Sequence, residues 1–190
     1  MLPKLRPEVL RAFVLASHYR GPVNYAEENL LQADAALSRL YLALRDVAPA
    51  GAAPRTEWTG RFAAAMDDDF NTPEALAVLQ QLARELNTAK AGGEAARAAL
   101  LGAELRALGA ILGLLRHDPA GWLATPSQLT SGAAEGAPTL SDADVEARIE
   151  ARTAARRAKQ WAESDRIRDE LAAAGIILED GAGGTRWRRK

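Results

Sequence analysis

Leucine and alanine recur at steps of three and four residues through most of the first 115 residues of this 190-residue chain. The clearest stripe consists of Leu30, Ala33, Leu37, Leu40 and Leu44. This spacing places all five side chains on one face of an α-helix. Such an apolar face is buried only when other helices pack against it. The sequence therefore predicts a mainly α protein whose helices pack into an antiparallel bundle.

Stripes of the same kind predict four or five helices before residue 118. The first begins with Pro7 and runs to about His18, because proline suits the first turn of a helix. Asn24 and Glu27 are spaced as in a capping box for the helix of the clearest stripe. A later helix is expected to begin with Thr72 as cap and Pro73 at its first position. The other expected core residues are Val9, Leu10, Phe13, Val14, Trp58, Phe62, Met66, Leu76, Leu79, Leu82, Leu86, Leu101, Leu105, Leu108, Leu112 and Leu115.

The periodic pattern ends at Pro119, where Pro, Gly, Ser, Thr and Ala typical of a flexible linker begin. After it, Ser141 and Asp144 form a second candidate capping box for a helix to about Arg157, and another helix runs from near Trp161 to Gly175. Two extended runs joined by a glycine-rich turn then predict a β-hairpin. We expect a helical bundle over 1–118, a flexible linker over 119–140 and a small α-helical domain over 141–190 that ends in this hairpin.

The residues that enzymes commonly use are scarce in this sequence. There is no cysteine, and His18 and His117 lie on different predicted helices, so no acid–base pair is indicated. Phosphate-binding glycine motifs are absent. The run Asp67–Asp69 is the one candidate for a magnesium site, but we favour a structural interpretation in which it ends a helix and Asn71 and Thr72 cap the next. We expect no catalytic residue and no metal site.

The formal net charge of -1 does not exclude a nucleic-acid ligand, because phosphate is attracted by locally clustered charge. No apolar run approaches the roughly 20 residues of a membrane span, and the N-terminus lacks the apolar core of a signal peptide. We therefore expect a cytoplasmic protein that does not enter a membrane. We also expect it to be monomeric.

Two faces are expected on the last helix. Ile167, Leu171 and Ala174 form its core stripe, whereas Trp161, Asp165 and Arg168 share another face. An indole offers a stacking surface, a carboxylate accepts from base amino groups, and a guanidinium holds a base edge or a phosphate. This second face therefore suits an unstacked nucleobase.

The preceding helix carries a strip of cations at the rim of its buried side, and the end of the chain adds Trp187 and Arg188. The strip consists of Arg148, Arg152, Arg156 and Lys159. Spacing alone leaves open an alternative in which both helices are solvated and form ordinary ion pairs such as Asp165 with Arg168. A second alternative is a protein-interaction module whose leucine stripes bind a partner or a second copy.

Three segments, found in order, resemble the C-terminal part of bacterial cysteinyl-tRNA synthetases. They are His18-Tyr19-Arg20 with Val23-Asn24-Tyr25 and Glu27-Glu28-Asn29-Leu30, then Ala65-Met66-Asp67-Asp68-Asp69-Phe70-Asn71-Thr72-Pro73-Glu74-Ala75, then Gly175-Ile176 through Leu178-Glu179-Asp180-Gly181 to Trp187-Arg188-Arg189-Lys190. The resemblance covers nearly the whole chain. It implies a helical bundle that contacts the tRNA elbow and stem, followed by a small domain that reads the GCA anticodon of tRNA(Cys).

The resemblance also implies which residues contact the anticodon. The family's arginine, tryptophan and two aspartates match Arg156, Trp161, Asp165 and Asp180. We add as further possible RNA contacts the residues Arg152, Lys159, Arg168, Trp187 and Arg188.

The family's catalytic half, with its nucleotide-binding fold, its HIGH-type and KMSKS-type signatures and its zinc ligands, has no counterpart in this sequence. The sequence begins where the family's has just left its KMSKS-type loop. The resemblance therefore implies a fragment of an ATP-dependent class I cysteine-tRNA ligase. We expect that fragment to be inactive by itself and to hold neither the ATP nor the zinc of the catalytic domain.

Overall fold

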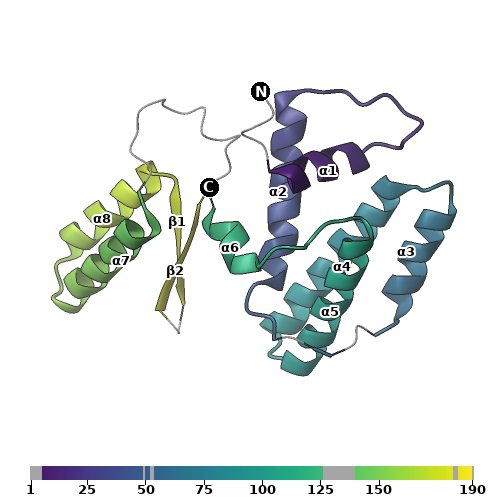
Figure 1. Ribbon diagram of the computed structural model, residues 1–190. Helices are drawn as coiled ribbons and strands as arrows, with labels where there is room; N and C mark the ends of the chain where they lie inside the picture. The colour runs from purple at the N-terminus through teal and green to yellow at the C-terminus, as the bar shows by residue number, and fades with distance from the viewer. Residues whose placement is uncertain (1–5, 49, 52–53, 126–139, 182–183, 190) are drawn as a thin grey trace. The chain divides into compact units, whose positions relative to one another are not determined.

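The computed structural model describes residues 6–48, 50–51, 54–125, 140–181 and 184–189. This part of the chain is mainly helical and ends in a two-stranded antiparallel sheet, as the sequence predicts (Figure 1). Among the described residues, no helix has the length and apolarity needed to cross a membrane. The elements are α1 (Pro7–Leu15), α2 (Glu27–Leu44), α3 (Glu57–Asp67), α4 (Thr72–Ala91), α5 (Ala95–Ile111), α6 (Pro119–Ala124), α7 (Asp142–Arg157), α8 (Trp161–Ala173), β1 (Ile176–Gly181) and β2 (Gly184–Arg189).

The chain divides into two compact units, with the boundary between Trp122 and Leu123. We call the described residues up to Trp122 the helical unit and those from Leu123 onward the hairpin unit. The expectation of a flexible linker from residue 119 is wrong at its start, because residues 119–124 form α6. Asp118 Oδ2 accepts from the Gly121 N–H at 2.8 Å and so supports this helix at its first turn. The rest of the expected linker, residues 126–139, lies outside the described residues.

The helical unit buries the stripe on which the fold prediction rests. All five residues of the α2 stripe are buried, and α4 packs against both α3 and α5. Other predicted core positions differ: Val14 is 49% exposed, and Met66 and Leu76 are only half-buried. The spacing thus predicts the buried side of α2 correctly, whereas the edges of the shorter stripes face solvent where no neighbouring helix covers them.

Two predicted helix boundaries in the first part of the chain are wrong. The first helix ends at Leu15 rather than near His18, because His18 forms a separate turn in which its carbonyl accepts from the Gly21 N–H at 2.8 Å. The second helix begins at Glu27 without a side-chain cap. Asn24, expected as its cap, instead accepts at its backbone carbonyl from Asn29 Nδ2 at 3.1 Å.

Asn71, and not Thr72, caps α4. Asn71 Oδ1 accepts from the Glu74 N–H at 3.2 Å. The Thr72 hydroxyl instead donates to the Leu15 carbonyl at 2.8 Å, which ties the start of α4 to the end of α1. Both residues are good caps, so this tertiary partner decides between them.

The aspartate run has a structural role, as expected. The third helix ends at Asp67, and the Asp69 carboxylate accepts from the Tyr19 hydroxyl at 2.7 Å and lies 3.2 Å from Arg20 Nη2. Throughout the described ranges, no group of three His, Cys, Asp or Glu side chains is placed to hold a metal ion.

The hairpin unit has its own small core of Val145, Ile167, Leu171 and Ile176, against which Leu178 and Trp187 pack. The predicted capping box is confirmed: Ser141 Oγ accepts from the Asp144 N–H, and Asp144 Oδ2 accepts from the Ser141 N–H. Ala174, expected in the core, is exposed. The chain turns at Gly175, whose φ is +76°, and brings Ile176 into the core instead.

Candidate nucleic-acid interface

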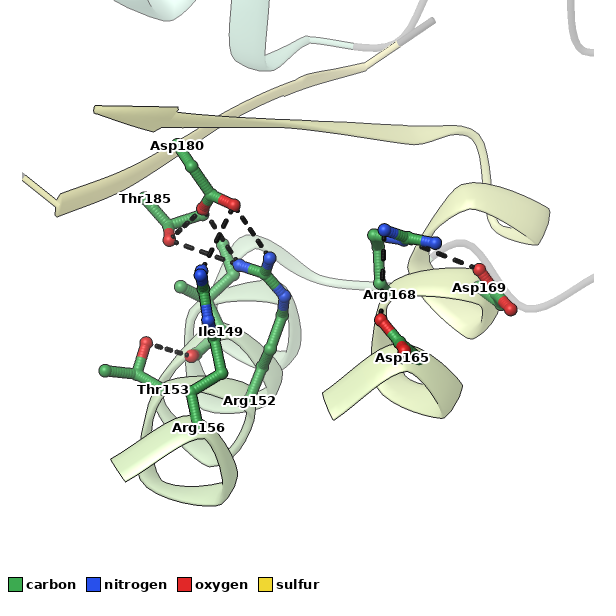
Figure 2. A network of polar contacts seen from close by, with 9 residues as sticks. All are labelled: Ile149, Arg152, Thr153, Arg156, Asp165, Arg168, Asp169, Asp180 and Thr185. Atoms are coloured by element: carbon green, nitrogen blue, oxygen red, sulfur yellow. Dashed lines mark hydrogen bonds and ion pairs between the residues drawn. The ribbon is translucent and has the colours of Figure 1, made fainter. Parts of the chain in front are cut away.

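Asp180 lies near the end of β1, directly opposite Thr185 of β2 in the antiparallel register. Thr185 Oγ1 donates to Asp180 Oδ1 at 2.6 Å. The Arg152 guanidinium reaches the same carboxylate from α7, with Nη1 at 2.9 Å from Oδ1 and Nη2 at 2.7 Å from Oδ2 (Figure 2). A fork of this kind fixes both the position and the plane of the carboxylate.

The surroundings of Asp180 favour its ionised form. The hydrogen bonds from Arg152 and then from Thr185 are the main causes that hold the pKa of Asp180 well below its ordinary value. The same pairing raises the pKa of Arg152. The Arg152 side chain is only 7% exposed, so this guanidinium belongs to the interior of the hairpin unit.

Arg156, one turn further along α7, contacts the same carboxylate from outside. Its Nη1 lies 3.3 Å from Asp180 Oδ2, and its side chain is 49% exposed. Figure 2 shows the two guanidiniums converging on Asp180 from one side of α7. A carboxylate has about four acceptor positions, and here two donors from Arg152 and one each from Thr185 and Arg156 use them.

Lys159 occupies the tight turn between α7 and α8 with a left-handed φ of 58°. The Lys159 N–H donates to the Arg156 carbonyl at 3.1 Å and the Gln160 N–H to the Ala155 carbonyl at 2.9 Å, which closes α7 in the manner of a Schellman motif. The Lys159 side chain is exposed, and its ammonium has no ion pair within the described part of the chain.

Trp161 is the first residue of α8 and is 59% exposed. A tryptophan so exposed is uncommon, because its indole is among the largest apolar groups that folding can bury. Its position places an aromatic surface five residues after Arg156, across the turn that Lys159 forms. An aromatic group beside cations is the combination that stacks a base and holds its phosphate.

Asp165 and Arg168 share the predicted second face of α8, and the ion pair of the alternative interpretation is also present. Arg168 Nη1 lies 3.8 Å from Asp165, and Arg168 Nε lies 3.6 Å from Asp169. Figure 2 draws Arg168 with these two acids, apart from the group around Asp180. All three side chains are more than half exposed, so these contacts are weak and exchangeable.

The two predicted contacts on β2 are not brought to Asp180. Trp187 is half-buried and packs against the core of the hairpin unit. Arg188 points to the other face of the hairpin, where its Nε lies 3.1 Å from Glu179 Oε1. The alternation of side chains along a strand places Arg188 on the face opposite Asp180, whereas Trp187 shares the face of Asp180 but lies opposite Leu178, over the core.

Thr185 is not among the residues predicted for the site. Arg156 is predicted as an anticodon contact and Arg152 as a further possible RNA contact, but their spacing does not show that Arg152 is buried and Arg156 exposed. The pairing of Thr185 with Asp180 could have been predicted from the sequence, because residues equally distant from a hairpin turn lie opposite each other. The difference between the two arginines depends on where the hairpin packs on α7. No local pattern carries that information.

Comparison with known proteins assigns both parts of the chain. Residues 61–116 match the model of the DALR domain, and residues 139–188 match that of the cysteinyl-tRNA ligase anticodon binding domain. Cysteine-tRNA ligase of Methylococcus capsulatus is 57% identical over 195 residues, which cover 100% of this chain and 40% of that protein. Cysteine-tRNA ligase of Alkalilimnicola ehrlichii is 52% identical, with the same coverages. That of Pseudomonas aeruginosa is 51% identical over 99% of this chain and 39% of its own length.

Proposed function

We propose that this chain, which belongs to the cysteine-tRNA ligase family and spans about 40% of the length of these relatives, binds tRNA(Cys) and reads its GCA anticodon with the hairpin unit. The observation that carries the proposal is the exposed Trp161, which begins α8 shortly after Arg156 near the end of α7 and Lys159 in the turn. A stacking surface and cations then occur together on one short stretch, and Arg156 of that stretch contacts the Asp180 carboxylate, in a domain whose family model is anticodon-binding.

Each side chain has a distinct part in this proposal. Trp161 stacks on an unpaired anticodon base, while Asp165 and Asp180 accept hydrogen bonds from base amino or imino groups. Arg156 and Lys159 neutralise phosphates of the anticodon loop. The helical unit contacts the tRNA stem and elbow. The chain needs no cofactor for this binding and performs no aminoacylation by itself.

A titration of the wild type and of Trp161→Ala with tRNA(Cys) and with a non-cognate tRNA tests the proposal. The wild type prefers tRNA(Cys). Trp161→Ala weakens that binding about 5- to 150-fold, which corresponds to the roughly 1 to 3 kcal/mol of one base stacked on an aromatic ring. Fluorescence of labelled tRNA at low protein concentration measures both dissociation constants.

The matched control is Trp58→Phe, because Trp58 is a buried tryptophan of α3 and is not among the predicted RNA contacts. It leaves the preference for tRNA(Cys) unchanged. Affinity also falls steeply as salt rises, since phosphate contacts release counterions. Equal and weak binding of both tRNAs by wild type and Trp161→Ala alike contradicts the proposal.

A further inference from the structure

We infer that Arg152 is a positioning residue, which holds the Asp180 carboxylate for the RNA without contacting it, and that Arg156 is the donor which an incoming base displaces from Asp180. This inference rests on the proposed function and assigns two different tasks to arginines one helical turn apart.

The geometry of Arg152 suits a fixed support. Its side chain is 7% exposed, and both terminal nitrogens are within 2.9 Å of Asp180. Nη1 also lies 3.3 Å from the Thr185 hydroxyl, so α7 is joined to both strands of the hairpin. If Arg152 left this carboxylate, its guanidinium would be buried without its ion-pair partner, which is costly. Arg152 therefore stays in place when RNA binds.

Arg156 is the most easily displaced of the partners of Asp180. It makes one contact of 3.3 Å, whereas the Arg152 and Thr185 donors lie at 2.6 to 2.9 Å. It is also the exposed one of the two arginines. Because the acceptor positions of Asp180 are occupied, a base amino group can bind only after one donor leaves. Arg156 leaves from Oδ2, and its freed guanidinium then takes a phosphate or base edge of the same RNA.

The ligand for the vacated position on Oδ2 is a base edge that presents an N–H, such as a cytosine or guanine amino group. Thr185 still occupies Oδ1, so one hydrogen bond at Oδ2 is expected rather than a pair. Discrimination between anticodons then depends on how firmly Arg152 holds this carboxylate. General affinity for RNA does not depend on it.

The experiment compares dissociation constants for tRNA(Cys) and for a copy altered only in its anticodon. Arg152→Lys keeps the charge but loses the planar fork. The ratio of the dissociation constant for the altered copy to that for tRNA(Cys) therefore falls at least about tenfold, while affinity for the altered copy is unchanged. Arg148→Lys is the control on the same helix, since Arg148 lies 3.8 Å from Glu170 and not on Asp180. It leaves the ratio unchanged.

Nitrogen-15 NMR of the arginine side chains tests the exchange separately. Addition of tRNA(Cys) shifts the Nε–H signal of Arg156 and leaves that of Arg152 in place. A shift of Arg152 as large as that of Arg156 overturns the inference.

A second variant covers the case in which Arg152→Lys does not fold, as judged by circular dichroism. Thr185→Val keeps the arginine fork and removes one donor to Asp180, and it lowers the ratio by about threefold. If the wild type discriminates between tRNA(Cys) and the altered copy, an unchanged ratio in either folded variant overturns the inference. The proposed function is then still supported. A wild type that does not discriminate overturns both.

Discussion

Asp180 links pH to the stability of the hairpin unit. Its pKa in the folded chain lies below the ordinary value of 3.8, chiefly because Arg152 and Thr185 donate to the ionised form. Above about pH 5 both folded and unfolded chains carry the charge, so the full stabilisation is present. As pH falls below about 4, the unfolded chain takes up the proton first, and the stabilisation is progressively lost.

We predict that Asp180→Asn lowers the free energy of unfolding by about 1 kcal/mol at pH 7, a value discounted for the solvent exposure of the carboxylate. The difference from wild type shrinks as pH falls from about 5 toward 2. Urea unfolding followed at several pH values measures it.

Asp165→Asn is the control for this prediction, because the Asp165 side chain is 65% exposed and its nearest cation is 3.8 Å away. It changes the free energy of unfolding by less than about 0.5 kcal/mol. A penalty for Asp180→Asn that stays constant down to pH 2 contradicts the assignment of this pH dependence to Asp180.

Among the elements, the turn from α7 to α8 combines backbone strain with a position in the proposed RNA-binding surface. Lys159 adopts a φ of 58°, a conformation that costs a residue with a Cβ about 1 to 2 kcal/mol. Glycine is the usual residue at this place in a Schellman motif. Lysine at this place lowers the free energy of unfolding relative to glycine and puts a cation between Arg156 and Trp161 in the sequence.

We predict that Lys159→Gly raises the free energy of unfolding by about 0.5 to 1 kcal/mol, after allowance for the greater freedom of glycine in the unfolded chain. The same variant weakens binding to tRNA(Cys), since one cation is lost. Chemical denaturation and the tRNA titration measure the two effects.

Lys159→Ala separates strain from charge in this turn. It loses the same ammonium but keeps a Cβ, so it weakens RNA binding as much as Lys159→Gly and does not share the gain in stability. If alanine stabilises the hairpin unit as much as glycine does, strain at Lys159 is not the cause.

Across the helical unit as a whole, buried Glu8 joins segments that are distant in sequence. Only 4% exposed, it accepts from the Tyr41 hydroxyl at 2.9 Å and from the Leu115 N–H at 2.5 Å. His117 Nε2 lies 3.3 Å from its other oxygen. One carboxylate of α1 thereby holds α2 and the chain after α5 together.

We predict that Glu8→Gln lowers the free energy of unfolding of the helical unit by about 1 to 3 kcal/mol, because the amide nitrogen faces a donor and leaves a buried polar group unpaired. Hydrogen exchange of the α1 and α2 amides measures the loss. Glu28→Gln is the matched control, since Glu28 lies exposed on α2, and it leaves this exchange unchanged. Equal exchange in both variants contradicts the role given to Glu8.

Local patterns predict much of this molecule. The Leu30 to Leu44 stripe identifies the buried side of α2, and the Ser141 capping box identifies the start of α7. Both depend on residues a few positions apart, which a sequence displays directly. The sequence offers both Asn71 and Thr72 as caps of α4 and does not decide between them, because the partner that engages Thr72 is Leu15, 57 residues earlier.

The sequence by itself determines most of the helices, the hairpin, the family resemblance and the elements on which Arg156, Trp161 and Asp180 lie. Only the tertiary structure decides which arginine is buried and which is exposed. Arg152 and Arg156 lie on one strip of α7, yet the hairpin covers the first and leaves the second half exposed. Packing of the hairpin brings Asp180, 28 residues after Arg152, to the helical turn that carries Arg152. Arg152 therefore makes two hydrogen bonds to this carboxylate and Arg156 makes one.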